Sequence, residues 1–343
     1  MNEPTIRVRG LTVRYRTRDS VTYATDNVSF DLHRGQILTL VGESGCGKTT
    51  AGMSVLRLLP GEADVVSGEV WYGGRDLMAM NDRELRPIRG RHIAMIFQDA
   101  VAGLNPVIDV GSQVAEMLTS HLDISKKEAR TRAIDVLHDV GLSDPARVAK
   151  AYPFQLSGGM CQRVMIGIAT ALNPDVIIAD EPTSALDVTI QAQILHQLDR
   201  LRHERGTAIL LITHDFGVVA DIADRVGVMY AGRLVETGTL DEIFYDPQHP
   251  YTWGLLGSVP RIESTRQARL AQIEGQPPSL IDPPTGCRFR DRCPHAFDKC
   301  GVEPDLVSRV ADPSHLDRCW LEVSERPALR QLPNGLIGLA SPE

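Results

Sequence analysis

The stretch GESGCGKT at residues 42–49 decides how the rest of this chain is understood. It follows an apolar run at 37–41 that predicts a buried strand, and it leads into residues 50–59, which predict a helix. A phosphate-binding loop requires this context, because glycines let backbone N–H groups turn toward phosphate oxygens while the helix presents its positive end. In such a loop Lys48 reaches the terminal phosphates and Thr49 holds Mg²⁺. The full spacing and both flanks favour this interpretation over a chance glycine-rich turn.

Length and composition limit the class of protein and the number of domains. A chain of 343 residues predicts one large and one small domain, and its 43% hydrophobic and 23% charged residues are ordinary for a soluble globular protein. The formal net charge of −8 argues against a general nucleic-acid binder. Since there is neither an apolar run long enough to cross a bilayer nor an export signal at the start, we expect the chain in the cytosol.

Two regions have the pattern of antiparallel strands. Residues 5–34 alternate apolar and polar side chains, which predicts strands with one buried face, and residues 226–238 predict a closing hairpin. Tyr15 and Tyr23 precede the phosphate loop, and either ring can stack on an adenine. An aromatic side chain that simply fills a sheet face is an equal alternative for each of them.

A helical region separates the next two strands. The strand at 92–97 ends in Gln98, where an amide can reach a metal ion or water beside phosphates, although such a glutamine is usually just solvated. Residues 99–151 are then helical in character, and 126–140 place apolar side chains on one face before Gly141. This predicts a helical insertion that moves as a unit.

The stretch LSGGMCQR at residues 156–163 forms a second candidate anion site. Ser157 is a natural cap, and two glycines follow it where a helix running through 164–172 begins. Two phosphate-binding helix starts would be redundant in a single site.

Acidic and imidazole side chains follow the last two apolar strands. The strand at 176–179 leads to Asp180, placed to hold Mg²⁺ through water, and Glu181, placed to polarise an attacking water as a general base. The strand at 208–213 ends in His214, which can contact a γ-phosphate or position the water. Taken alone, the acidic pair is equally explained as a solvated loop, and a lone histidine is more often structural.

In this order the motifs resemble the nucleotide-binding subunit of an ATP-binding cassette (ABC) transporter over residues 5–240. The resemblance implies an α/β P-loop NTPase fold: a mixed-sheet core with an antiparallel β subdomain and a helical subdomain at about 99–165. It assigns catalysis to Gln98, Glu181 and His214, Mg²⁺ to Thr49, Gln98 and Asp180, and the D-loop to the residues ending at Asp187. The residues it assigns to bound ATP are Tyr15, Gly42, Ser44, Gly45, Cys46, Gly47, Lys48, Thr49, Thr50, Gln98, Asp180 and His214.

The same resemblance explains the second helix start. In this family two subunits pair head to tail, so the signature residues Ser157, Gly158, Gly159 and Gln162 contact ATP bound to the partner. The second cassette is another copy or, as is usual in the subfamily, a homologue. Cys161 stands where the signature usually has a basic residue, and we expect ATP binding to survive this change. The family's adenine-stacking aromatic fits Tyr15 best, but the insertion at 16–22 leaves Tyr23 open.

Four of the six cysteines lie in the last sixth of the chain. Cys287, Cys293, Cys300 and Cys319 form a C-x5-C-x6-C-x18-C array, which in a cytosolic protein indicates a metal site rather than disulfides. Four thiolates can bind Zn²⁺ or an iron–sulfur cluster, and spacings wider than C-x2-C favour the cluster. Four buried, inert cysteines are the remaining alternative.

The segment from 249 to 321 resembles the C-terminal region of oligopeptide/dipeptide importer ATPases, and this resemblance implies a [4Fe–4S] cluster at the four cysteines. We therefore expect a cassette at 1–240, a loop-rich metal-binding extension at 241–330 and a flexible tail at 331–343.

The resemblance implies the ATP-hydrolysing subunit of a peptide importer, peripheral at the cytoplasmic face of the membrane. Its expected partners are a second ABC ATPase, an extracellular binding protein and two permeases, which it contacts around residues 104–106; no nucleic acid is expected. Importers of nickel, glutathione or oligosaccharide stay open as alternatives. A remote alternative is a soluble ABC ATPase acting on ribosomes or DNA, although such proteins usually carry two cassettes or long coiled-coil insertions.

Overall fold

The computed structural model describes residues 3–184, 186–259 and 273–330. The chain divides into two compact units, each built from separate segments of sequence. Unit 1 consists of Met1–Thr5, Leu32–Gln36 and Arg75–Leu211, and unit 2 of Ile6–Asp31, Ile37–Gly74 and Ile212–Glu343. The tail expected to be flexible, 331–343, lies outside the described residues.

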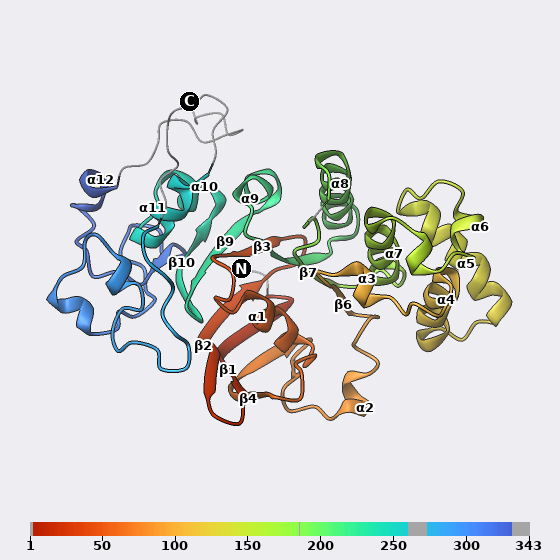
Figure 1. The fold of residues 1–343 in the computed structure, drawn as a ribbon, viewed down its shortest axis with the longest axis horizontal. Coiled ribbons are helices and arrows are strands. Elements are labelled where there is room, and N and C mark those ends of the chain that lie inside the picture. The colour runs from red at the N-terminus through yellow and green to blue at the C-terminus, as the bar shows by residue number, and fades with distance from the viewer. Residues whose placement is uncertain (1–2, 185, 260–272, 331–343) are drawn as a thin grey trace. The chain divides into compact units, whose positions relative to one another are not determined.

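Unit 1 combines a parallel strand pair with a group of helices. Strands β6 and β7 pair in parallel, with Ile93 opposite Val176, and β8 is the next neighbour of β7. Helices α4, α5 and α7 contact one another, and α6 contacts α5, so these four form the group seen in Figure 1. The elements are β5 (Arg75–Asp76), α2 (Asp82–Leu85), β6 (Ile93–Ile96), α3 (Ala100–Gly103), α4 (Val110–His121), α5 (Lys126–Asp139), α6 (Pro145–Val148), the 3-10 helix Pro153–Gln155, α7 (Gly158–Thr170), β7 (Val176–Asp180), α8 (Val188–Arg205) and β8 (Ala208–Ile212).

The amphipathic helix predicted at 126–140 is confirmed as α5. Ala129, Ala133 and Leu137 are fully buried, and Ser125 caps the helix by accepting a hydrogen bond from the Glu128 N–H. Gly141 follows the helix with φ of 74°, a left-handed conformation that suits glycine at a helix end.

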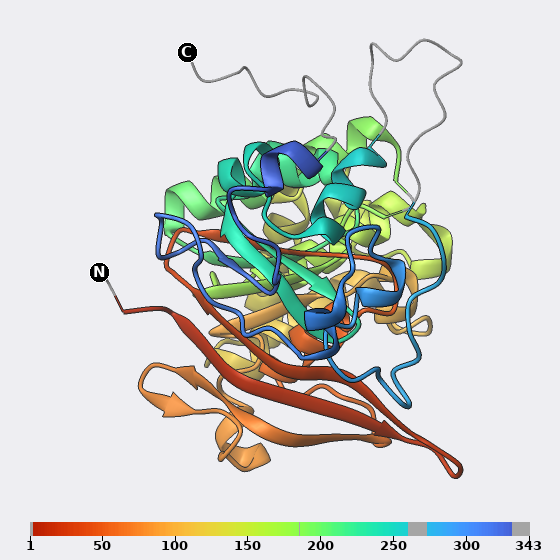
Figure 2. The ribbon, with the colours of Figure 1, turned by 90° about the vertical axis from the view of Figure 1, so that its left-hand side faces the viewer.

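Unit 2 contains two sheets. One has the order β2-β1-β4, with β1 and β4 antiparallel, and Figure 2 shows β1 and β2 as two long neighbouring strands in red. The other has the order β11-β10-β9-β3 and is mixed, because β9 is parallel to β3 and antiparallel to β10. The elements are β1 (Ile6–Arg16), β2 (Val21–Leu32), β3 (Ile37–Val41), α1 (Lys48–Val55), β4 (Ala63–Tyr72), α9 (Phe216–Ile222), β9 (Arg225–Tyr230), β10 (Arg233–Thr239), α10 (Leu240–Tyr245), α11 (Pro250–Gly257), the 3-10 helices Arg290–Arg292 and Asp298–Gly301, β11 (Leu316–Asp317) and α12 (Arg326–Leu329).

The hairpin predicted at 226–238 is confirmed as β9 and β10. Its two-residue turn consists of Ala231 and Gly232, with φ of 46° and 84°. Two successive residues with positive φ match the right-handed twist of the strands that they join.

A buried acid joins β10 to the C-terminal segment. The Glu236 carboxylate is fully buried and accepts hydrogen bonds from the backbone N–H groups of Gln248 (2.6 Å) and His249 (3.0 Å). His315 Nε2 lies 2.8 Å from the same carboxylate. Burial opposes the positive charge of His315, but the hydrogen bond and charge of Glu236 outweigh it, so the pKa of His315 is raised. The pair is therefore stabilising while the imidazole is protonated.

We expect the His315→Gln variant to be destabilised most at low pH. Because the folded-state pKa of His315 lies above its ordinary value near 6.5, its contribution is complete below that value and is lost as pH rises through the folded-state pKa. The melting temperature should therefore differ more from the wild-type value at about pH 6 than at about pH 9. His138→Gln is the control, since His138 is 77% exposed. Equal differences at both pH values would contradict the charged pair.

Candidate functional site

In unit 2 the phosphate loop lies between the fully buried strand β3 and helix α1. The helix begins at Lys48, earlier than expected, because Gly47 caps it in the left-handed conformation with φ of 104°. A Cβ at Gly42 would lie 2.1 Å from the Met229 carbonyl oxygen, and one at Gly47 would lie 2.0 Å from that of Ala24. Only glycine allows this close approach of backbones.

The Lys48 ammonium is hydrogen-bonded to the backbone of this loop. It donates hydrogen bonds to the backbone carbonyls of Gly42 (2.7 Å) and Glu43 (3.1 Å), and its side chain is buried. Cys46 is also buried, which raises the pKa of its thiol. Ser44, Gly45 and Thr49 are exposed. The loop thus presents small residues and a helix start to solvent, while the Lys48 ammonium is bonded to its carbonyls.

Two further predicted residues lie beside the loop in unit 2. The Tyr15 hydroxyl is 3.3 Å from the Thr50 hydroxyl at the start of α1. The Thr213 N–H donates to the Leu40 carbonyl at 3.2 Å, so His214 leaves the sheet next to the end of β3. The Tyr23 N–H donates to the carbonyl of Leu280. Of the two tyrosines, Tyr15 is the one whose side chain reaches α1.

In unit 1 the structure brings together two predicted catalytic residues. Gln98 Nε2 donates a hydrogen bond to Glu181 Oε2 at 2.9 Å. Asp180 ends β7 and is 3% exposed, and Glu181 follows it with φ of 44°. A residue other than glycine at positive φ is strained, and such strain is held only where the surroundings impose it. The geometry presents the Glu181 carboxylate beyond the end of the strand.

The signature residues lie at the start of α7. Ser157 is the N-cap, as predicted, and its Oγ accepts a hydrogen bond from the Met160 N–H at 3.3 Å, while Gly158 is exposed and Gly159 is half-buried. The helix begins at Gly158, directly after this cap. Cys161 and Gln162 are buried, and burial raises the pKa of the Cys161 thiol. The unusual cysteine therefore faces the protein interior.

Asp187 caps helix α8. Its Oδ1 accepts a hydrogen bond from the Ile190 N–H at 3.0 Å. The predicted D-loop is described except for residue 185. A helix cap is thus one role of this aspartate.

The prediction of a four-cysteine metal centre gains no support from the described geometry. Among the described ranges no group of three or more His, Cys, Asp or Glu side chains is arranged to hold a metal ion. Burial raises the pKa of the Cys287 and Cys319 thiols to about 12 and that of the Cys293 thiol to about 11. All four cysteines nevertheless line one cavity, together with Phe289 and Trp320.

The sequence did not predict the residues outside the phosphate loop that contact its Glu43. Arg292 makes a two-pronged ion pair with Glu43, at 2.7 and 2.9 Å, and the Tyr251 hydroxyl accepts the Glu43 N–H at 2.9 Å. The available signal was the alternation of arginines in CRFRDRC at 287–293, together with an acidic residue inside the loop.

Comparison with known proteins decides the family. A family profile described as ABC transporter matches residues 25–184, and one described as the oligopeptide/dipeptide transporter C-terminal region matches residues 235–300. The dipeptide transport ATP-binding protein DppD of Bacillus subtilis is 48% identical over 93% of this chain and 95% of its own length. The chain belongs to the ABC transporter family. The oligopeptide transport ATP-binding protein OppD of the same organism is 44% identical over 94% of this chain and 90% of its own length.

Solved structures agree with this ABC assignment. The ATP-binding cassette MJ0796, in a dimeric post-hydrolysis state bound to ADP and Pi, has a TM-score of 0.62 and 30% identity, covering 68% of this chain and 98% of its own. The cassette cbiO1 of Clostridium perfringens has a TM-score of 0.59 and 26% identity, covering 71% of this chain and 92% of its own. The predicted ABC cassette fold, with a mixed and an antiparallel sheet, is confirmed. Within the described part of this ABC subunit, no helix has both the length and the apolar character to span a bilayer.

Proposed function

We propose that this chain is the ATP-binding and ATP-hydrolysing subunit of an ABC importer for dipeptides or oligopeptides. The hydrogen bond from Gln98 to Glu181 carries the catalytic part of the proposal. It holds a carboxylate at the exit of β7, where a general base can take the proton of a water that attacks the γ-phosphate. The relatives named for dipeptide and oligopeptide transport support the cargo.

Roles within the ATP site follow from the chemistry of the side chains. Lys48 and the backbone N–H groups of the loop bind the phosphates, and Tyr15 stacks on the adenine. Thr49, Gln98 and Asp180 supply oxygen atoms, the donors that Mg²⁺ prefers, and so fit the ion. When bound, Mg²⁺ neutralises charge that develops on the phosphate oxygens. His214 positions the attacking water.

The signature residues serve the ATP of a second subunit. Gly158 is exposed and Gly159 is half-buried at the start of α7, where the first backbone N–H groups of a helix have no partner within the helix and can bind an anion. The solved MJ0796 cassette is a dimer. We infer pairing with a second cassette, and a homologue is the expected partner.

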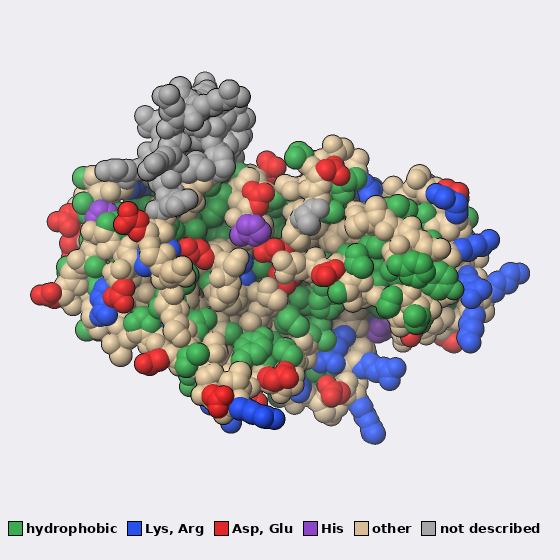
Figure 3. All heavy atoms as spheres, viewed as in Figure 1, with side chains coloured by type: hydrophobic (Ala, Val, Ile, Leu, Met, Phe, Trp, Pro, Cys, Tyr) green, Lys and Arg blue, Asp and Glu red, His purple; other side chains and the backbone are tan. Residues whose placement is uncertain are grey.

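The permease surface is proposed on unit 1, near residues 104–106. Several large hydrophobic side chains of this unit are exposed, and Figure 3 shows hydrophobic side chains on the surface of its helices at the right. Val107 is 78% and Phe154 is 72% exposed, and the rings of Phe154 and Tyr152 stack with centroids 5.6 Å apart. An apolar surface of this kind marks a protein contact. The proposed location is therefore peripheral, on the cytoplasmic side of the membrane.

Affinity capture of this chain from its own cells in mild detergent tests the importer proposal. We expect mass spectrometry to find two multi-span permeases, a second ABC ATPase and an extracellular binding protein whose purified form binds peptides. A binding protein that takes nickel, glutathione or oligosaccharide would overturn the peptide cargo alone. Ribosomal or DNA-repair partners without any membrane protein would overturn the transport function.

We expect the Glu181→Gln variant to bind ATP normally but to hydrolyse it about 10²- to 10⁴-fold more slowly, because the amide cannot accept the proton. Phosphate release by the purified transporter complex and binding of a fluorescent ATP analogue measure the two steps. Glu204→Gln is the control, since Glu204 is exposed on α8 and its partner is Arg200 at 3.8 Å. Near-normal hydrolysis by the Glu181 variant would exclude the general-base role.

A second proposal concerns the cavity lined by Cys287, Cys293, Cys300 and Cys319. We propose that it takes a [4Fe–4S] cluster, with Zn²⁺ as the weaker alternative. The support is that four thiols share one cavity and that backbone N–H groups of Phe289, His295 and Leu321 point to Cys287, Cys293 and Cys319, respectively. Such N–H groups favour thiolates and are typical supports of cluster ligands. The cluster would staple an extension that has little regular structure.

The Cys287→Ser variant should lose most of the iron and melt at a lower temperature, because one of four ligands is replaced. Iron content and the visible absorption spectrum of anaerobically purified chain provide the measurement. The control is Cys161→Ser, because Cys161 is buried in α7 and its thiol donates to the Pro153 carbonyl. Equal iron in both variants, or zinc in the wild type, would reject the cluster.

A further inference from the structure

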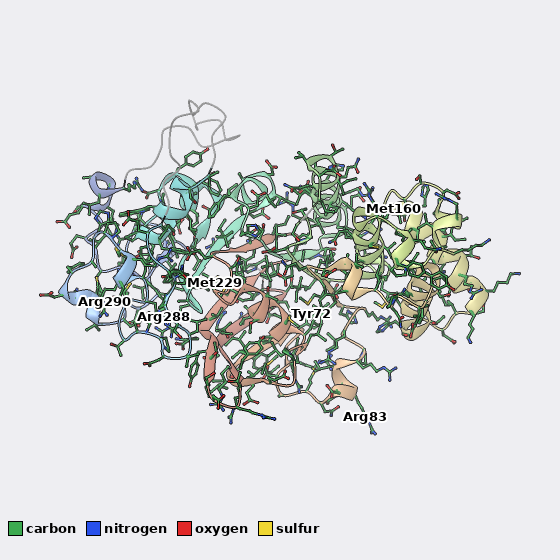
Figure 4. All side chains as sticks on the ribbon, viewed as in Figure 1. Tyr72, Arg83, Met160, Met229, Arg288 and Arg290 are labelled. Carbon is green, nitrogen blue, oxygen red and sulfur yellow. The ribbon has the colours of Figure 1, made fainter. Side chains whose placement is uncertain are left out.

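The loop between Cys287 and Cys293 has three arginines, and they have different surroundings. Arg288 and Arg292 point toward the cassette side of unit 2 and are nearly buried, with side chains 5% and 6% exposed. Arg290 is 36% exposed, and its ion pair is with the neighbouring Asp291. Figure 4 shows Arg290 outward of Arg288 along the same loop. The loop therefore presents two arginines inward and one to solvent.

Arg292 uses its whole guanidinium on the phosphate loop and its neighbours. Its two terminal nitrogens donate to the two carboxylate oxygens of Glu43. The remaining N–H groups reach the Tyr230 hydroxyl (3.3 Å) and the backbone carbonyls of Ile273 (3.2 Å) and Glu274 (2.9 Å). The hydrogen bonding that Arg292 donates to Glu43 is the largest cause that raises the pKa of Arg292. A guanidinium held by five hydrogen bonds has one geometry, and so does the carboxylate that it grips.

A cluster of aromatic side chains supports this ion pair between Arg292 and Glu43. The Tyr251 hydroxyl accepts the hydrogen bond of the Glu43 N–H, and its ring lies 4.5 Å from that of Tyr230. Phe289, from the same loop as Arg292, is buried against both rings, with centroids 5.3 and 5.4 Å away. Glu43 is thus fixed at its backbone by one residue and at its side chain by another.

Arg288 acts on the opposite side of the phosphate loop. Its guanidinium donates to the Ala231 carbonyl in the turn of the β9–β10 hairpin and pairs with Asp26. The next residue of that turn, Gly232, donates its N–H to the Cys46 carbonyl at 2.9 Å. The loop at 287–293 therefore reaches the phosphate loop by two routes, directly at Glu43 and through the hairpin turn at Cys46.

We propose that Arg292 is a positioning residue of the nucleotide site, which fixes the phosphate loop in its anion-binding conformation through Glu43. The backbone N–H groups that bind phosphate act best when they are held in place before the nucleotide arrives. The four residues 44–47 include two glycines, and the Gly232 N–H holds the carbonyl of Cys46 among them. An anchor at Glu43 gives the loop a second fixed point and so matters for affinity. This inference rests on the proposed ATP binding.

The test compares Arg292→Gln with Arg290→Gln in the full-length chain. Both variants remove one arginine from the same loop, but only Arg292→Gln removes the ion pair with Glu43. We expect Arg292→Gln to bind a fluorescent ATP analogue about tenfold more weakly, the loss typical when a supporting partner of a binding group is removed. Arg290→Gln should bind with wild-type affinity. Equal affinity for all three proteins would overturn the proposal.

A double-variant cycle separates positioning from a general loss of structure. Glu43→Gln should weaken binding as Arg292→Gln does, and the double variant should be no weaker than either alone, because both break one contact. Arg292→Lys restores the charge but not the two-pronged geometry, so it should recover binding only in part. Additive losses in the double variant would reject the coupling.

If Arg292→Gln fails to fold, Arg292→Lys alone tests the same contact, since it keeps the positive charge and removes the two-pronged hydrogen bonding to Glu43. Reduced affinity with an unchanged melting temperature would support positioning, and wild-type affinity would overturn it. A wild-type chain that does not bind the analogue would instead overturn the proposed ATP-binding function.

Discussion

The phosphate loop is pressed between two neighbouring backbones, and much of unit 2 is arranged to hold it there. Gly42 lies against the Met229 carbonyl in β9, and Gly47 lies against the Ala24 carbonyl in β2. One contact is therefore with the mixed sheet, through β9, and the other is with the antiparallel sheet, through β2. The glycine that permits each contact also leaves the loop without side chains of its own to stiffen it. The stiffness comes from Lys48 beneath the loop carbonyls and from Glu43 at its edge.

In unit 1 the corresponding constraint is a charged carboxylate, that of Glu181, at the end of a buried strand. Strand β7 is buried throughout, so a carboxylate at its end needs polar partners. Gln98, at the end of the neighbouring strand β6, supplies one for Glu181. Parallel pairing of the two strands places both of their carboxyl ends at one edge, where polar side chains from distant parts of the sequence meet.

Local pattern predicted those parts of the fold that local physics determines. The apolar runs at β3, β7 and β8, the amphipathic helix α5 and the β9–β10 hairpin lie within a residue or two of their predicted positions. Helix α1 begins earlier than predicted, because a glycine that looks like a loop residue can cap a first turn. The predicted cysteine centre depends on how four separate loop positions approach one another, and spacing in the sequence does not determine this. Arg292 and Glu43 escaped prediction because residues 249 positions apart leave no periodic signal.

The long separation of these two residues also orders events during synthesis of the chain. A ribosome adds roughly 5–20 residues per second, so roughly 12–50 s pass between the translation of Glu43 and that of Arg292, given their separation of 249 residues. Throughout that interval the nascent chain carries its complete phosphate loop without the arginine that grips it. Products of interrupted translation that end after residue 214 but before residue 288 contain every cassette motif and neither anchoring arginine. The phosphate loop can therefore make its contact with Arg292 only after translation has passed residue 292, long after all the cassette motifs have been synthesised.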